Sequence, residues 1–479
     1  MYKKNHNKQL AFSNFNQPPG LQLNPENRWI KKAETIPWNL IEERYAELFP
    51  SNRGVPAKPL RMALGSLIIQ KQIGCSDREL VEQLTENPYF QYFIGLPGYR
   101  MEPPFVPSLL VEFRKRLTEE ILGAINDMIL EYNAPDDPDD DDLSGFHEGG
   151  SEDQDSEKGN SGTLILEATC APQNIEYPQD INLLNKGRED LEGIIDELSY
   201  AYKLKKPRMY RQNAGADYLA LAKCRKRTGK RIRKAIKKQL QYVRRDLRYI
   251  DEYLAQGIEF DAGQLERIDV IRKVYEQHDY MYCNKTHTVP DRIVSISQPH
   301  IRPIVRGKSK APTEFGAKLD LSIENGFARI EKLSFDPYNE SDVLISAAEQ
   351  YCKRNGNYPE RILADKIYRN RKNLAFCKLH GIRLSGPALG RPKKDPSVDK
   401  KTEYIDAVDR IEVERAFSLA KRSFGLGLIT TRLENTTRSS IVLSIIAMNV
   451  DRLTRLSFMR FLLSFFQGSN VGRSLEPTF

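Results

Sequence analysis

Apolar and polar residues alternate with a helical period through the first third of the chain. Between residues 38 and 132, apolar side chains recur at steps of three and four, and Leu60, Leu64, Leu67 and Ile68 fall on one face of a helix. This pattern predicts an all-α region. It indicates a bundle of amphipathic helices that share one apolar core.

A second helix is predicted directly after the first. Ser76 is followed three residues later by Glu79, the spacing of a capping box, in which the two side chains satisfy free backbone N–H groups at a helix start. The two helices are joined by the short segment 73–75. This arrangement is compatible with a DNA-binding helix-turn-helix, although the spacing alone favours an ordinary helical hairpin.

The pattern changes to strands after residue 162. A strand is predicted at 163–170, and a hairpin at 317–335, because alternating segments flank the turn dipeptide Asn325-Gly326. Weaker strand signals occur at 292–298 and 300–307, and a helix (341–356), a short buried strand (360–365) and another helix (370–381) follow. The order of these elements predicts a mixed α/β core.

A long helical insertion separates the first strand from the hairpin. Within 219–256, apolar residues trace one helix face: Ile232, Ile236, Leu240, Val243, Leu247, Ile250 and Leu254. The other faces are basic, with thirteen Lys and Arg and a single Asp between Lys223 and Arg248. Because like charges at this density repel one another, they favour a polyanionic partner over a merely solvated surface.

Charge elsewhere supports the same partner. The 479 residues carry a net charge of +8, but residues 136–157 contain eleven acidic and no basic residues, so the remainder carries +19. The acidic run is predicted to be a flexible linker.

Six scattered cysteines and six histidines lack zinc-ligand spacing, which favours reduced thiols in a cytosolic protein. Arg and Asp residues interrupt the apolar segment 441–466, which predicts a buried helix rather than a membrane span.

Three carboxylates stand at positions suited to metal chemistry. Glu167 ends an apolar run in the first strand, Asp365 ends the short buried strand, and Glu414 lies in a later helix. In that helix, Arg410, Glu414 and Lys421 share one face. Phosphodiester cleavage with two divalent ions needs oxygen ligands of this kind, with cations beside them to hold phosphate. Spacing alone is a weak indication, because many acid triples occur in a chain of this length.

At these residues the chain resembles bacterial insertion-sequence transposases of the DDE class, which have an N-terminal helical transposase domain before a ribonuclease H-like catalytic core. The resemblance runs from about Trp38 to Leu453. It is carried, in order, by VPSLLVEFRKRL (106–117), LILEATCAPQNIEYPQDINLLNKGRE (164–189), EFGAKLDLS (314–322), ILADKIYRNRKN (362–373) and VERAFSLAKRSFGL (413–426).

The resemblance implies that Glu167, Asp365 and Glu414 are the catalytic and metal-binding acids, which hold two Mg²⁺ ions, with Mn²⁺ able to substitute. It also implies that Arg410 and Lys421 grip DNA phosphate near the cut. A Tyr expected at position 407 is replaced by Ala. The larger departure is Glu167, where the family pattern leads one to expect Asp. The extra methylene moves the carboxylate oxygens by roughly 1.5 Å, and a misplacement of about 1 Å can cost about a hundredfold in rate.

Further residues are assigned on charge and position. Lys366 and Arg369 after the second acid and Arg391 in a basic loop are predicted to contact DNA. Asp320 is predicted to be an outward, solvated strand residue, and Asp180 is a weak substitute for the first acid. Predicted DNA contacts in the insertion are Arg225, Arg227, Arg231, Lys234 and Lys238.

The predicted architecture is a ribonuclease H-like α/β core with an N-terminal all-α domain and a long helical insertion. Its parts are an N-terminal arm (1–37), a helical DNA-binding domain (38–132), an acidic linker (133–161), the catalytic core (162–182 and 290–453), the basic helical insertion (183–289) and a C-terminal helix and tail (454–479).

The predicted function is a DNA transposase that binds the ends of its mobile element and performs Mg²⁺-dependent strand cleavage and transfer. The expected partners are double-stranded terminal-repeat DNA, target DNA and a second copy of the chain, with no membrane and no small-molecule substrate. The expected location is the bacterial cytoplasm, at the nucleoid. Two alternatives stay open: a catalytically impaired or repurposed transposase that only binds DNA, and a two-metal nuclease unrelated to transposition.

Overall fold

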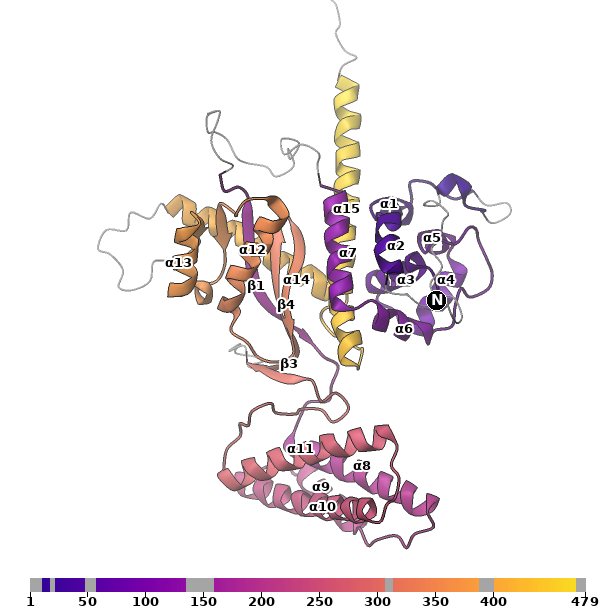
Figure 1. Cartoon of the computed structure of the whole chain (residues 1–479), viewed down its shortest axis with the longest axis vertical. Coiled ribbons are helices and arrows are strands. Elements are labelled where there is room, and N and C mark those ends of the chain that lie inside the picture. The colour runs from indigo at the N-terminus through magenta and orange to yellow at the C-terminus, as the bar shows by residue number, and fades with distance from the viewer. Residues whose placement is uncertain are drawn as a thin grey trace, which may run out of the picture.

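The computed structural model describes residues 11–17, 22–47, 57–134, 159–305, 313–386 and 400–470. Most of the predicted acidic linker, together with Arg391 in the predicted basic loop, lies outside these residues. The described chain forms three parts, a helical region near the N-terminus, a sheet with helices on both faces, and a separate helical insertion (Figure 1).

The N-terminal region is all-helical, as its pattern predicted. It contains a short 3-10 turn, η1 (Phe12–Asn14), and helices α1 (Arg28–Glu34), α2 (Trp38–Ala46), α3 (Leu60–Ile73), α4 (Asp77–Glu86), α5 (Pro88–Phe93), α6 (Leu109–Arg116) and α7 (Glu119–Tyr132). Half of the predicted capping box is present: the Ser76 hydroxyl accepts a hydrogen bond of 3.2 Å from the Glu79 backbone N–H, whereas the Glu79 carboxylate accepts from the Gln83 side chain. Helix α1 has Trp29 and Ile30 buried, so the predicted arm 1–37 contributes to the helical region itself.

The sheet is mixed and has six strands among the described residues. Its strands are β1 (Thr163–Pro172), β2 (Arg302–Val305), β3 (Thr313–Glu324), β4 (Phe327–Ser334), β5 (Arg361–Leu363) and β6 (Arg383–Leu384). The strand order is β2-β3-β1-β5-β6, with β4 also paired to β3. Strand β1 is therefore central, antiparallel to β3 and parallel to β5.

One strand prediction is confirmed and another is wrong. The hairpin is confirmed, since Asn325 and Gly326 join β3 to β4 and both have positive φ, which a two-residue turn of this twist requires. The weaker signal at 292–298 is wrong, because these residues form a loop. Ile293 and Ile296 in that loop are buried against the insertion, which explains their apolar character without a strand.

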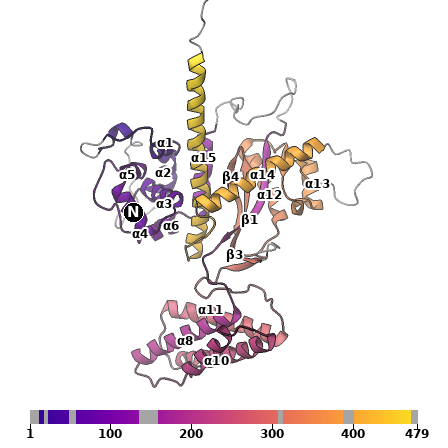
Figure 2. The same ribbon diagram turned by 180° about the vertical axis from the view of Figure 1, so that it is seen from behind.

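Each face of the sheet is covered by helices. Side chains of β1 alternate, so that Leu164 and Leu166 pack with α12 (Val343–Asn355) and α13 (Arg371–Leu379), whereas Ile165 belongs to the cluster of α14 (Lys400–Ser423) and α15 (Glu434–Asn470). Two 3-10 turns, η3 (Glu340–Asp342) and η4 (Lys366–Tyr368), connect the strands and helices on the first face. Figure 2 shows α14 crossing in front of the sheet when the molecule is seen from behind.

The insertion has its own hydrophobic core. It consists of α8 (Asp180–Ala201), α9 (Arg211–Ala222), α10 (Gly229–Ala255) and α11 (Ala262–Asn284). The predicted face of α10 is buried at Leu240, Val243, Leu247 and Ile250. The prediction is wrong at Leu254, which is 43% exposed because the helix ends one residue later. All seven residues of the predicted face lie within α10, which residues 223–228 separate from α9.

Helix α15 joins the N-terminal helices to the sheet, and one cluster of buried apolar residues continues across all three. At its centre, Asn449 of α15 accepts a hydrogen bond from the Ala328 N–H of β4 and donates to the Ala328 carbonyl and to Asn126 of α7. The helix runs unbroken across the predicted boundary at 453. It is not a fully buried helix, since Phe458 and Met459 are exposed. No helix in the described ranges is both long enough and apolar enough to cross a membrane.

Candidate active site

Strand β1 holds Glu167 in the middle of the sheet, on the face covered by α14. Thr163, Ile165, Glu167 and Thr169 share this face, because side chains alternate along a strand. The flanking residues on the strand are buried, whereas the Glu167 side chain is 25% exposed. The carboxylate is thus fixed by a rigid strand and remains accessible from one side.

Strand β5 brings Asp365 to the same level. The parallel ladder pairs Ile165 with Leu363, and two further residues along each chain lead to Glu167 and Asp365. Leu363 packs in the same cluster as Ile165, so alternation directs Asp365 toward the α14 face as well. Asp365 is exposed and caps η4, where its carboxylate accepts a hydrogen bond of 2.7 Å from the Lys366 N–H. The prediction that the second acid follows the buried strand is consistent with this geometry.

Helix α14 supplies the third acid and two cations. Val413 and Phe417 are buried against the sheet, and the Arg410 guanidinium lies 3.9 Å from the Glu167 carboxylate. Three turns further along, the Lys421 ammonium donates a hydrogen bond of 2.9 Å to the Thr169 hydroxyl of β1. These two contacts lie on either side of Glu414 along the helix, so α14 runs beside β1 at the position of Glu414.

Ion pairs fix α14 on the edge of the sheet. Asp406, which is 6% exposed, accepts hydrogen bonds from Arg361 of β5 and from Arg383 of β6. Arg361 also pairs with Asp409 at 2.7 Å and donates to the Thr163 hydroxyl of β1. The helix that carries Glu414 is therefore attached by ion pairs to β5, which precedes Asp365, and to β6, and Arg361 links this attachment to β1, which carries Glu167.

The side chains themselves are not arranged around a common centre. Among the described residues, no group of three or more His, Cys, Asp or Glu could hold a metal ion as the side chains lie. Glu167 is directed to Arg410, and Asp365 to its own turn. The donor chemistry nevertheless fits a hard divalent cation, since all three candidates are carboxylates and none is fully buried.

Asp320 corrects a prediction. It is fully buried, not solvated, and it lies on the opposite face of the sheet from Glu167. Its carboxylate accepts hydrogen bonds from the hydroxyls of Tyr338 and Tyr368. Burial raises the pKa of Asp320, while the two hydroxyl donors act in the opposite direction. The alternation with Leu319 and Leu321 suggested a solvent face, but α12, α13 and their connecting turns cover it.

The predicted cations near the second acid have different surroundings. Lys366 is exposed beside Asp365. Arg369 instead donates hydrogen bonds to the carbonyls of Leu384 and Ser385, at 2.6 Å and 2.8 Å, so its observed contacts are internal. Asp180, the weak substitute for the first acid, pairs with Arg292 and His278 at the base of the insertion.

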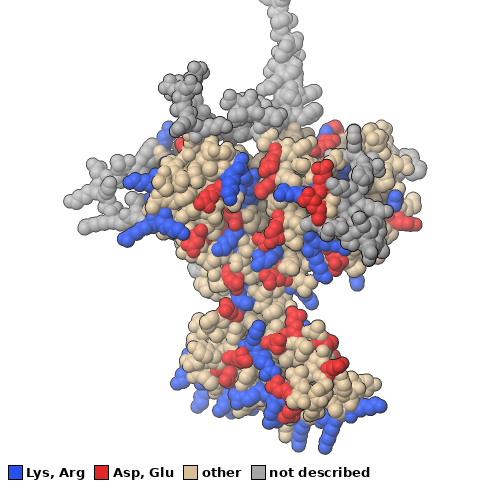
Figure 3. Space-filling model, viewed as in Figure 1, with Lys and Arg blue, Asp and Glu red and all other residues tan. Residues whose placement is uncertain are grey.

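The insertion carries a basic surface at the α9–α10 connection and the first half of α10. Residues 223–238 hold ten Lys and Arg and no acid, and most of these side chains are exposed. Blue side chains protrude from the lower edge of the insertion in Figure 3. Three predicted DNA contacts have internal partners as well: Lys238 pairs with Asp217, Arg227 donates to the Ala222 carbonyl, and Arg231 to the Lys226 carbonyl. Within the described part of the chain, no ion pair is formed by Arg225, Lys230, Lys234 or Lys237.

The hairpin of α3 and α4 is built as part of the bundle. Helix α3 is buried from Leu60 to Ile69, and Asp77 of α4 pairs with Arg114 of α6. The exposed residues of α4 are Arg78, Glu82 and Glu86. Because two of these three are acidic, this face is poorly suited to enter a groove lined by phosphates, and the geometry favours the ordinary hairpin.

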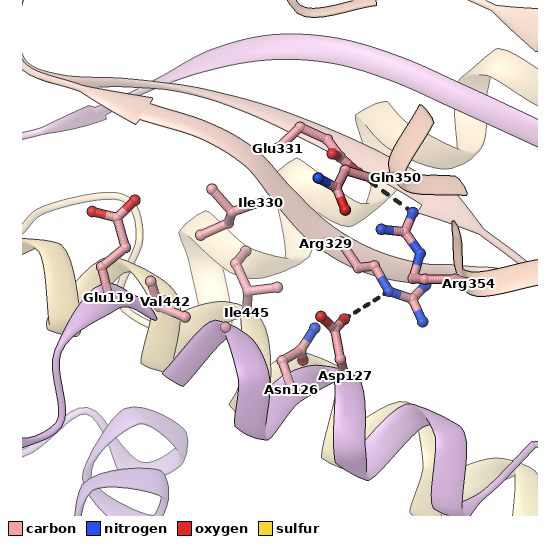
Figure 4. Close-up of a pocket in the computed structure, with 11 residues that line it drawn as sticks. Glu119, Asn126, Asp127, Arg329, Ile330, Glu331, Gln350, Arg354, Val442 and Ile445 are labelled. Carbon is pink, nitrogen blue, oxygen red and sulfur yellow. Dashed lines mark hydrogen bonds and ion pairs between the residues drawn. The ribbon is translucent and has the colours of Figure 1, made fainter. Parts of the chain in front are cut away.

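A polar cavity of about 260 Å³ lies elsewhere, at the junction of α7, β4, α12 and α15 (Figure 4). Four of its charged residues form two ion pairs: Arg329 lies 2.9 Å from Asp127, and Arg354 lies 3.6 Å from Glu331. Burial raises the pKa of Glu331, and the neighbouring arginines oppose that rise. These contacts attach the N-terminal helices to the sheet, so the cavity belongs to the junction between them.

Two families match separate parts of the chain. A transposase DDE domain matches residues 362–451, which include Asp365, Arg410, Glu414 and Lys421, and a transposase domain (DUF772) matches residues 20–116. The first match begins after Glu167. A curated relative, an uncharacterized protein, ORF8 in the nfe locus of Rhizobium meliloti, is 33% identical over 107 residues, which cover 21% of this chain and 51% of the relative. The alignment thus spans about half of that relative. No solved structure matches the chain.

Both matched domains are transposase domains, and in this order they support an insertion-sequence DDE transposase. The resemblance noted in its sequence is confirmed at this level. The family generally uses divalent metal ions.

Proposed function

We propose that this transposase binds the DNA ends of its mobile element and cleaves and transfers DNA strands at a site formed by Glu167, Asp365 and Glu414. One observation carries the proposal. The β1–β5 ladder brings two of the acids level on one face of the sheet, and α14, which bears the third, contacts β1 beside Glu167. We further propose that the core is ribonuclease H-like, with the central β1 between antiparallel β3 and parallel β5 as support.

The three carboxylates would hold divalent cations, which we take to be two Mg²⁺ ions, with Mn²⁺ able to substitute. When bound, such ions supply Lewis acidity to the attacking and leaving oxygens of a phosphodiester. The protein's own contribution is orientation and charge. Arg410 and Lys421 present cations on either side of Glu414, where they can hold a phosphate against the sheet.

The basic surface of the insertion is the proposed grip on DNA backbone. Lys230, Lys234 and Lys237 follow one another at helical spacing on an exposed face of α10. The positive end of the helix dipole at Gly229 adds to their field, since no side chain caps this end. Lys366 extends the contact beside Asp365. Because the contacts are to phosphate, affinity should fall steeply with salt.

Pairing of two element ends would require at least two copies of the chain on DNA. The N-terminal helices are attached to the sheet through α15, so they would move with the core during such an assembly. We do not place the sequence-reading element at α4, because of its acidic exposed face. Double-stranded element ends and target DNA remain the proposed partners.

A DNA-binding protein with little or no cutting activity is the second candidate. It is favoured by one observation, that Glu167 stands where the family pattern has Asp and is directed to Arg410 at 3.9 Å. An acid engaged with this cation is displaced from the role of metal ligand, and it also neutralises a proposed phosphate contact. In that case the basic insertion would bind DNA, but the site on the sheet would not cleave it.

Strand cleavage of DNA from the flanks of the gene separates these readings. The natural chain and Glu167→Asp are compared with Mg²⁺ and with Mn²⁺, and Asp365→Asn serves as the inactive control. Cleavage at element ends, followed by joining of a 3′-hydroxyl to target DNA, supports the transposase proposal. Cutting without preference for ends and without joining indicates an unrelated nuclease. Binding without cutting, even by Glu167→Asp, would contradict the proposed site.

A further inference from the structure

The turn that carries Asp365 is tied to the opposite face of the sheet. Tyr368 lies three residues after Asp365, at the end of η4, and is fully buried. Its hydroxyl donates a hydrogen bond of 2.6 Å to one carboxylate oxygen of Asp320 on β3. Asp320 is itself fully buried, so the bond between them is shielded from water.

A second tyrosine completes the environment of Asp320. The hydroxyl of Tyr338 donates to the other carboxylate oxygen. Tyr338 follows β4, and its backbone carbonyl accepts a hydrogen bond of 3.0 Å from Lys318, which also pairs with Glu340. The two tyrosines therefore give the same buried acid one donor each, but only Tyr368 belongs to the turn that bears a proposed metal ligand.

Neighbouring residues hold the rest of this turn. The Ala364 N–H donates to the Ser385 hydroxyl at 3.1 Å, where the ladder of β5 has ended. Asn373 donates to the carbonyls of Tyr368 and Ser341, each at 2.8 Å. On either side of Asp365 the backbone is thus fixed, upstream by Ser385 and downstream by Tyr368. Asp365 itself is exposed, and its hydrogen bonds lie within the turn: its carboxylate accepts from the Lys366 N–H, and its backbone carbonyl accepts from the Tyr368 N–H at 3.0 Å.

We propose that Asp320 is a positioning residue of the active site, which fixes the backbone at Asp365 by holding the Tyr368 hydroxyl from the far face of the sheet. The inference rests on the proposed function, because it treats Asp365 as a metal ligand. A strand end alone leaves the following turn free to pivot. The buried acid removes that freedom, since an unpaired buried carboxylate or hydroxyl would be costly.

The experiment compares Tyr368→Phe with Tyr338→Phe in the full chain. Each variant removes one hydroxyl from the same carboxylate, so a purely structural role of Asp320 predicts equal effects. The positioning role predicts faster backbone hydrogen exchange at residues 364–369 in Tyr368→Phe only. It also predicts a several-fold weaker binding of Mn²⁺, measured by the electron paramagnetic resonance of the free ion, again in Tyr368→Phe only. Both variants should lose a similar amount of thermal stability.

A milder variant guards against loss of the fold. Asp320→Asn keeps one acceptor oxygen and the side-chain volume, and it should give an intermediate increase in exchange at 364–369. Strand cleavage by Tyr368→Phe should fall about ten- to a hundredfold, because small displacements of a ligand are costly in rate.

The outcomes separate this inference from the function itself. Equal changes in exchange and Mn²⁺ binding in the two tyrosine variants, or no change at 364–369 in Tyr368→Phe, overturn the positioning role even if the natural chain cuts DNA. If the natural chain binds no Mn²⁺ and Glu167→Asp cuts no DNA, the proposed function fails, while hydrogen exchange still decides whether Asp320 fixes the turn.

Discussion

The basic side chains of the sheet site are paired with acids, whereas those of the insertion extend from an exposed helix face. At the sheet, Arg361 and Arg383 are engaged with Asp406, and Arg410 lies against Glu167. On α10, Lys230 and Lys234 extend from an exposed helix face. Cleavage of a phosphodiester depends on positions fixed to within about an ångström, whereas attraction of a DNA backbone depends on the number of available charges. The two regions suit these two requirements.

The largest expected effect comes from removing an acid at the sheet. Asp365→Asn or Glu414→Gln should lower strand cleavage by about a thousandfold or more, because each would delete a proposed metal ligand. DNA affinity should stay unchanged, since the insertion is intact. Asp336→Asn, at an exposed loop acid, and Glu412→Gln, on the same helix, are matched controls. Loss of cleavage in a control variant, or retention of it in Asp365→Asn, would contradict the assignment.

A smaller change at the same site tests the longer side chain. Glu167→Asp should raise the cleavage rate by about ten- to a hundredfold, because it retracts the carboxylate from Arg410 and restores the length expected in the family. Single-turnover cleavage of end-containing DNA measures this rate. An equal rate in the two proteins would mean that the site accepts Glu, and a slower rate in Glu167→Asp would show that it is built around Glu.

The insertion should respond in affinity rather than in rate. Replacing Lys230, Lys234 and Lys237 by Ala should make the slope of log affinity against log salt shallower by about 2 to 3. The control replaces Arg244, Arg248 and Arg272, which pair with Asp279, Glu252 and Asp251. Filter binding over a range of salt measures both. If the control triple changes the slope as much as the lysine triple, exposed charge on α10 is not what binds DNA.

The smallest expected effect concerns the attachment between the N-terminal helices and the sheet. Asn449→Ala removes buried hydrogen bonds to Ala328 and Asn126 and should lower the free energy of unfolding by about 2 kcal/mol. Denaturant unfolding measures the change, with the exposed Asn435→Ala on the same helix as control. A loss no larger than that of the control would show that the two parts are joined only by apolar packing.

Local patterns in the sequence predicted much of this fold. The Asn325-Gly326 turn, the Ser76 hydrogen bond to Glu79 and the apolar face of α10 up to Ile250 all depend on residues close together in the chain, and each was found where expected. The positions of Glu167, Asp365 and Glu414 on a strand, a strand end and a helix were also predicted. Their roles as metal ligands remain predictions.

Long-range partners could not be predicted in the same way. Asp320 looked solvated because its strand neighbours are apolar, and only the packing of Tyr338 and Tyr368 from distant segments explains its burial. The continuous core through α15 was missed for the same reason, since nothing local indicates that Asn449 bonds to Ala328. An alternation of polar and apolar residues shows which side chains share a face of a strand, but tertiary packing decides whether solvent or another element covers that face.

The most direct test of the central claim is an anomalous-diffraction map of the protein crystallised with Mn²⁺ and DNA from the proposed element ends. The account predicts manganese peaks within coordination distance of the carboxylates of Glu167, Asp365 and Glu414, with Arg410 released from Glu167 to the DNA. Manganese bound elsewhere, or any one of the three carboxylates held away from the ions in that complex, would contradict it.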